Sequence, residues 1–184
     1  MNKNVLFIIC FMFLMFFGLS FAQSVNLSSS REERIEYVKS LQNLVYFEGK
    51  IINTDIQYIG FYFTTSLSQT VYFTCSGSFD NKDLIVNPDV FVEFPRMMNY
   101  DPVSVPVLVS YKARSSRKLE KWYTSASKDY KTLFSNKPKA LVKNFRTTGY
   151  FEVSAKTIND EWEKAELKLD KDFEIALSIL PCFN

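Results

Sequence analysis

The feature that most constrains the fold of this chain is a succession of short segments rich in β-branched and aromatic residues, which favour extended structure. Turn-forming groups such as Asn53-Thr54-Asp55 separate these segments. In segment 103–111, valines alternate with smaller or polar residues, as expected for a strand with one buried face. The pattern predicts antiparallel strands at residues 46–52, 57–65, 70–75, 84–86 with 89–94, and 103–111.

Two segments have helical periodicity instead. Residues 31–44 follow a capping box, in which Ser30 and Glu33 stand three positions apart, and carry an apolar stripe. Residues 116–134 carry a longer stripe at helical spacing, and Pro138 would end that helix. Its apolar members are Leu119, Trp122, Tyr123, Ala126, Tyr130, Leu133 and Phe134.

The C-terminal third returns to extended patterns, with strands predicted at residues 141–146, 150–158, 163–169 and 173–180. A helix from residue 160 onward competes with the last hairpin, because several apolar residues there also share a helical face. The sequence thus predicts an α+β fold: a mostly antiparallel sheet, small barrel or sandwich of about seven to nine strands, with an N-terminal helix and one basic amphipathic helix near residues 116–134.

The first 22 residues have the pattern of a cleavable secretory signal peptide. Lys3 precedes a long apolar run, and Ser20-Phe21-Ala22 supplies small residues before the expected cleavage point. The alternative is an uncleaved anchor, since the run is close to the roughly 18 apolar residues that span a bilayer. We expect residues 23–184 to form a single domain outside the cytoplasm, secreted or periplasmic.

After removal of that segment, which contains Cys10, two cysteines remain. An even number in an oxidising compartment predicts a disulfide between Cys75 and Cys182. Two buried thiols, or a bridge to another chain, are the alternatives. Asn26-Leu27-Ser28 is an acceptor pattern for glycosylation at Asn26, which matters only in a eukaryotic source.

Positive charge is concentrated in one part of the chain. Residues 112–146 hold 11 Lys or Arg and only 2 Asp or Glu. On the predicted helix these side chains would form a face able to bind anionic lipid or glycan. The alternative is a solvated face that complements acidic strands. The residues predicted to form this surface are Arg114, Arg117, Lys118, Lys121, Lys128 and Lys131.

The chain contains no histidine, which excludes Ser-His-Asp and Cys-His nucleophile systems and His-ligated zinc. Its scattered glycines form no phosphate-binding loop. We therefore expect no catalytic, cofactor-binding or metal-binding residues, no cofactor and no nucleic-acid partner. The acidic residues at 160, 161, 163 and 166 are the best place for a catalytic carboxylate pair, although a solvated face is the preferred interpretation.

The leading functional hypothesis is a non-enzymatic binding or interaction domain with an unknown protein or envelope partner. One alternative is an anionic membrane- or polyanion-surface binder that uses the basic helix. Another is a carrier of a small apolar ligand, because the 18 Phe and 10 Tyr residues suit a pocket lining as well as an ordinary core.

Overall fold

A computed structural model describes residues 25–54, 56–77, 87–99, 104–113, 115, 117–124 and 129–184. The predicted signal peptide and the predicted strand at 84–86 lie outside these residues. Within the described ranges, no helix is long and apolar enough to cross a membrane.

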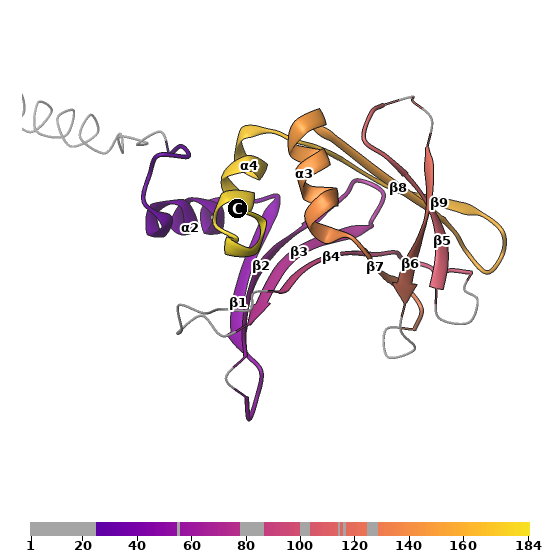
Figure 1. The fold of residues 1–184 in the computed structure, drawn as a ribbon, viewed down its shortest axis with the longest axis horizontal. Coiled ribbons are helices and arrows are strands. Elements are labelled where there is room, and N and C mark those ends of the chain that lie inside the picture. Colours follow the sequence, from indigo (N-terminus) through magenta and orange to yellow (C-terminus); the bar gives the residue numbers. More distant parts are fainter. Residues whose placement is uncertain are drawn as a thin grey trace, which may run out of the picture.

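The structure confirms an α+β fold built on one antiparallel sheet of nine strands, which curls into a half-barrel (Figure 1). The strands lie in the order β1-β2-β3-β4-β7-β6-β5-β8-β9, so β1 and β9 form the two edges. In chain order they are β1 (Leu44–Lys50), β2 (Gln57–Thr64), β3 (Thr70–Gly77), β4 (Asn87–Glu93), β5 (Ser104–Ser110), β6 (Lys118–Thr124), β7 (Thr132–Phe134), β8 (Tyr150–Lys156) and β9 (Trp162–Lys168).

Helices occupy the concave side of the curled sheet, here called the inner face (Figure 1). They are α2 (Arg31–Ser40), α3 (Pro138–Thr148) and α4 (Lys171–Ser178), followed by the short 3₁₀ helix η2 (Pro181–Phe183). Side chains alternate between the faces of each strand, so the convex outer face carries the other half of the strand residues.

A cluster of aromatic rings fills the space between the inner face and the helices. Phe73 lies at its centre and is fully buried, with ring centroids 5.3 Å from Phe61 and 5.4 Å from Phe173. We call this cluster the aromatic core. Its members are Phe61, Phe73, Phe145, Phe173 and Phe183.

The predicted N-terminal helix is confirmed, although it ends at Ser40. The Glu33 amide donates to the Ser30 hydroxyl (3.2 Å) and the Ser30 amide donates to the Glu33 carboxylate (2.8 Å), so the capping box forms. The Tyr37 hydroxyl donates to Asp172 (2.6 Å), which attaches α2 to α4.

The predicted amphipathic helix over residues 116–134 is wrong, because this segment supplies β6 and β7. Between them, Asp129 and Tyr130 have φ values of 50° and 54°, which a right-handed helix cannot contain. The helical spacing arose because β6 carries apolar residues on both faces. Trp122 is buried inside, whereas Leu119 and Tyr123 are exposed outside.

The strand predictions at 141–146 and 173–180 are also wrong, since these segments form α3 and α4. Pro138 begins α3 at its first turn, where a missing N–H is harmless, and Gly149 ends it in the left-handed conformation. Asp170 caps α4 by accepting from the Phe173 amide (2.8 Å). Most of α4 is buried, so its buried residues do not follow a helical period.

The predicted disulfide between Cys75 and Cys182 is confirmed, with 5.7 Å between the Cα atoms. It joins the inner face of β3 to η2, beside the aromatic core. The Arg146 guanidinium donates to the backbone oxygen of Phe183 (2.8 Å) and holds the same C-terminal segment against α3.

Candidate interaction surface on the outer face

The outer face carries five aromatic side chains at one register across five neighbouring strands. Each pairs directly with the next across the sheet, from β2 through β3, β4 and β7 to β6. We call this row the aromatic ladder. It consists, in spatial order, of Tyr62, Tyr72, Phe91, Phe134 and Tyr123.

Four of the five ladder rings, from Tyr62 to Phe134, contact one another in turn along the row. The Tyr72 and Phe91 rings are nearly parallel, with centroids 4.4 Å apart, and neighbouring pairs lie at 5.2 Å (Tyr62 with Tyr72) and 5.1 Å (Phe91 with Phe134). The Tyr72 and Phe91 ring faces meet each other, whereas the other two pairs are tilted by 41° and 34°. The centre of the ladder therefore presents ring edges and the Tyr72 hydroxyl group outward, as a ridge rather than a flat platform.

Two glycines extend the aromatic surface to the edge strand β1. A Cβ atom at Gly60 would lie 2.7 Å from the end of the Phe47 ring, and a Cβ at Gly49 would collide with Tyr58. Each ring thus occupies the space above a glycine on the paired strand. The ring centroids of Phe47 and Tyr62, the first ladder residue, lie 6.3 Å apart, so the aromatic surface spans six strands.

Much of this surface remains accessible to solvent. Tyr123 is 59% exposed and Tyr58 37% exposed, while the middle of the ladder is half-buried by its own neighbours. Val45, opposite Tyr62 in the register, adds exposed apolar area, and exposed Leu119 lies on the same face of β6 as Tyr123, with Lys121 between them. A continuous apolar surface of this kind on a sheet face indicates an interaction site more often than scattered apolar residues do.

The described outer-face residues of these strands include two carboxylates, Asp89 and Glu93, and one ammonium group, Lys121. The Tyr72 hydroxyl donates to Glu93 (3.1 Å). Burial and the neighbouring Glu93 carboxylate raise the pKa of Tyr72 to about 12, so its hydroxyl stays protonated at neutral pH. Partial desolvation raises the pKa of Asp89.

The other half of the outer face, formed by β5, β8 and β9, carries charged side chains that form ion pairs. Glu152 is 6% exposed; it pairs with Arg117 at 2.8 Å and accepts from the Tyr150 hydroxyl at 2.9 Å. Glu166, opposite Glu152 in the register, pairs with Lys164 at 3.0 Å. Among the described residues of this half, ion pairs rather than a row of rings occupy these outer-face positions.

The structure does not gather the predicted basic residues on one face. Lys118 and Lys121 lie on opposite faces of β6, and Lys121 is the one on the outer face. Arg117 is paired with Glu152, and Lys131 precedes β7. The two remaining members, Arg114 and Lys128, lie outside the described residues.

The acidic cluster near Trp162 is distributed among ion pairs. Asp160 pairs with Lys156 at 3.1 Å, and both Glu161 and Glu163 pair with Arg96. Desolvation raises the pKa of Glu163. Among the described residues, no group of three or more acidic or cysteine side chains could hold a metal ion.

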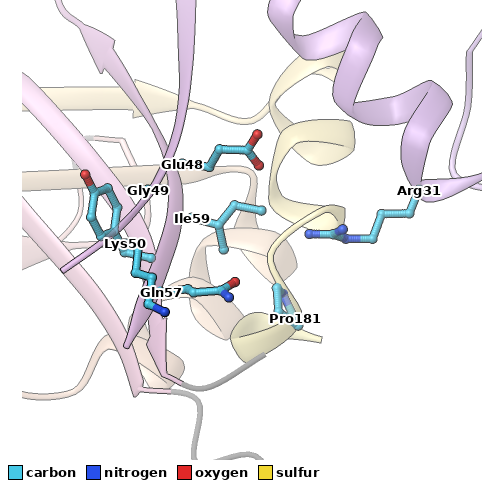
Figure 2. A pocket seen from close by; sticks show the side chains of 8 residues that line it. Arg31, Glu48, Gly49, Lys50, Gln57, Ile59 and Pro181 are labelled. Atoms are coloured by element: carbon cyan, nitrogen blue, oxygen red, sulfur yellow. The ribbon is translucent and has the colours of Figure 1, made fainter. Parts of the chain in front are cut away.

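A pocket of about 670 Å³ lies where the β1–β2 edge faces the start of α2 and η2. Figure 2 shows Glu48, Gln57 and Ile59 directed from the strands toward Arg31 and Pro181. The charges on its walls are mixed. The predicted glycosylation residue, Asn26, is exposed and accepts hydrogen bonds from Ser28 at the start of the described chain.

The sequence reasoning missed the aromatic ladder, although β2 contained a signal for it. On β2, Phe61 and Phe63 at odd positions point inward, while Tyr58 and Tyr62 at even positions point outward. When a strand has helices on one side only, aromatic residues at both its odd and its even positions indicate a second apolar face.

Comparison with known proteins gives no match to a family model, to a curated protein or to a solved structure.

Proposed function

We propose that this protein is a non-catalytic binding domain that acts outside the cytoplasm and contacts a protein partner through the aromatic ladder. The observation that carries the proposal is the single register of five aromatic side chains on the face opposite the aromatic core. The signal-like N-terminus and the Cys75–Cys182 disulfide support the extracytoplasmic location.

A protein partner fits this surface better than a polyanion, a membrane or a sugar does. The centres of protein interfaces are enriched in Tyr and Phe and depleted in charged residues, which describes the ladder and its surroundings. Asp89 and Glu93 outnumber Lys121 among the charged groups there, so anionic ligands gain little. The Tyr72 and Phe91 rings stack on each other, so the faces that they share are closed to a sugar.

Cross-strand aromatic pairs also stabilise sheets by about 0.2–1 kcal/mol each, so the test must separate binding from sheet stability. A photo-reactive phenylalanine analogue at position 123 probes the ladder. The same analogue at position 162 is the matched control, because Trp162 is also an exposed aromatic residue (51%, against 59% for Tyr123) but lies on β9.

The experiment uses the full chain, expressed in cells that naturally make it and irradiated before lysis. We expect a discrete cross-linked protein product from position 123 and at least about tenfold less from position 162, because a ladder interface would exclude β9. Equal yields at the two positions, or no product from position 123, would overturn the proposal.

A further inference from the structure

We propose that the partner is a second copy of this chain, bound face to face about a two-fold axis that runs along β7. This inference rests on the proposed function and names its partner. It places Phe134 of the two copies opposite each other on the axis, and it places β4 of each copy opposite β6 of the other.

The register of the three central strands makes this arrangement self-complementary. Both β4 and β6 run antiparallel to β7, so they are parallel to each other, and Phe91, Phe134 and Tyr123 lie at one level. A two-fold axis along β7 preserves that level while it exchanges β4 and β6. Phe91 of each copy then faces Tyr123 of the other, as an isologous interface requires.

Two charged residues support the same axis. Asp89 precedes Phe91 by two positions, and Lys121 precedes Tyr123 by two positions, so both lie on the outer face at a second shared level. Two strand spacings, about 10 Å, separate β4 from β6 within one copy. In the described part of the chain, neither Asp89 nor Lys121 has an ion-pair partner.

Across the proposed axis, Asp89 of one copy faces Lys121 of the other, and the reciprocal pair forms on the other side of Phe134. Sheets that pack face to face lie about 10 Å apart, a gap that an aspartate and a lysine side chain bridge together. The outer face is convex, so contact centres on β4, β7 and β6. A contact of this limited width predicts a reversible dimer with a Kd of about 1–100 μM.

The test is sedimentation velocity of the purified protein over a concentration range that spans this Kd. We expect Asp89→Lys and Lys121→Asp each to raise the dimer Kd at least about tenfold, because each substitution acts twice and places like charges together. The double swap should restore the Kd to within about threefold of the original. Tyr123→Glu should raise the Kd about thirtyfold or more.

Lys118→Asp is the matched control, since Lys118 is exposed on the same strand but on its opposite side, and it should leave the Kd unchanged. A monomer at every concentration, or a dimer that the swaps do not alter, would overturn the inference. So would two weakened single variants with no rescue in the double swap. A cross-link from position 123 to a different protein would overturn the dimer while the proposed function stands, whereas no cross-link would overturn both.

Discussion

Tyr72 and Phe73 are neighbours on β3, yet they belong to two aromatic clusters with opposite surroundings. Phe73 is fully buried against helices in the aromatic core, which is made only of phenylalanines. Tyr72 lies in the ladder on the outer face, where three of the five rings are tyrosines. The phenylalanine rings around Phe73 pack without a polar atom to satisfy, whereas a surface that meets both water and a partner suits an amphipathic ring. The difference supports our proposal that the ladder serves contact, whereas the core serves folding.

The adjacent residues of β3 provide the sharpest test of that difference. Phe73→Ala should lower the free energy of unfolding by about 3–5 kcal/mol, because it leaves a cavity among four other rings. Tyr72→Ser should lower it by only about 1 kcal/mol, since cross-strand pairs on an exposed face contribute little. Urea denaturation measures both values, and similar losses would erase the proposed distinction.

The disulfide should matter to the core and not to the ladder. Replacing Cys75 and Cys182 together by serine should lower the free energy of unfolding by about 2–5 kcal/mol, because the bridge closes a loop of 107 residues in sequence. Wild-type protein unfolded in the presence of a reductant should match the double variant. If the variant lost association while its stability was unchanged, the assignment of the two regions would be wrong.

Substitutions of the two glycines beneath the outer aromatic surface should have a smaller effect on stability, and Gly49 serves as the control for Gly60. Gly60→Ala should lower stability by about 1–3 kcal/mol, because the new methyl group would lie 2.7 Å from the Phe73 backbone oxygen, which cannot move away. At Gly49 the obstacle is the exposed Tyr58 side chain, which can rotate outward. Gly49→Ala should therefore change the free energy of unfolding, measured by urea denaturation, by less than about 1 kcal/mol.

The smallest expected effect is a pH dependence of the ladder. The pKa of Tyr72 is raised to about 12 in the folded chain, above the usual tyrosine value near 10. Its contribution is complete below pH 10 and is lost between about pH 10 and 12, because the unfolded chain releases the proton first. From about pH 9 to about pH 11, the free energy of unfolding should fall less in Tyr72→Phe than in the wild type. Urea denaturation at the two pH values measures both falls. Identical losses would contradict the shift.

The sequence predicted the strands whose residue types or spacing are typical of extended structure. Enrichment in β-branched and aromatic residues located β2 and β3, alternation located β5 and β9, and the Ser30–Glu33 capping box located α2. The prediction failed at α4 and β6, where the apolar spacing of one type of element imitates the other. In α4, Phe173, Ile175 and Leu177 are all buried between layers, so an alternating pattern was read as a strand.

The error at β6 came from the candidate site itself. Leu119 and Tyr123 are outward-facing, and Trp122 is inward-facing. Together they imitate a helical stripe that neither face alone would produce. The ladder could not be predicted from spacing, because its members come from five strands whose register depends on long-range pairing. Only the excess of aromatic residues at both strand parities indicated it.

The most direct test of the central claim uses one variant and two readouts. Tyr123→Ser changes the most exposed ladder residue, and the photo-reactive phenylalanine analogue at position 134 then reports contact at the centre of the proposed interface. We predict that the free energy of unfolding changes by less than about 0.5 kcal/mol, while the cross-link yield falls at least about fivefold. A loss of stability above about 2 kcal/mol with an unchanged yield would show that the ladder supports the sheet and not a partner.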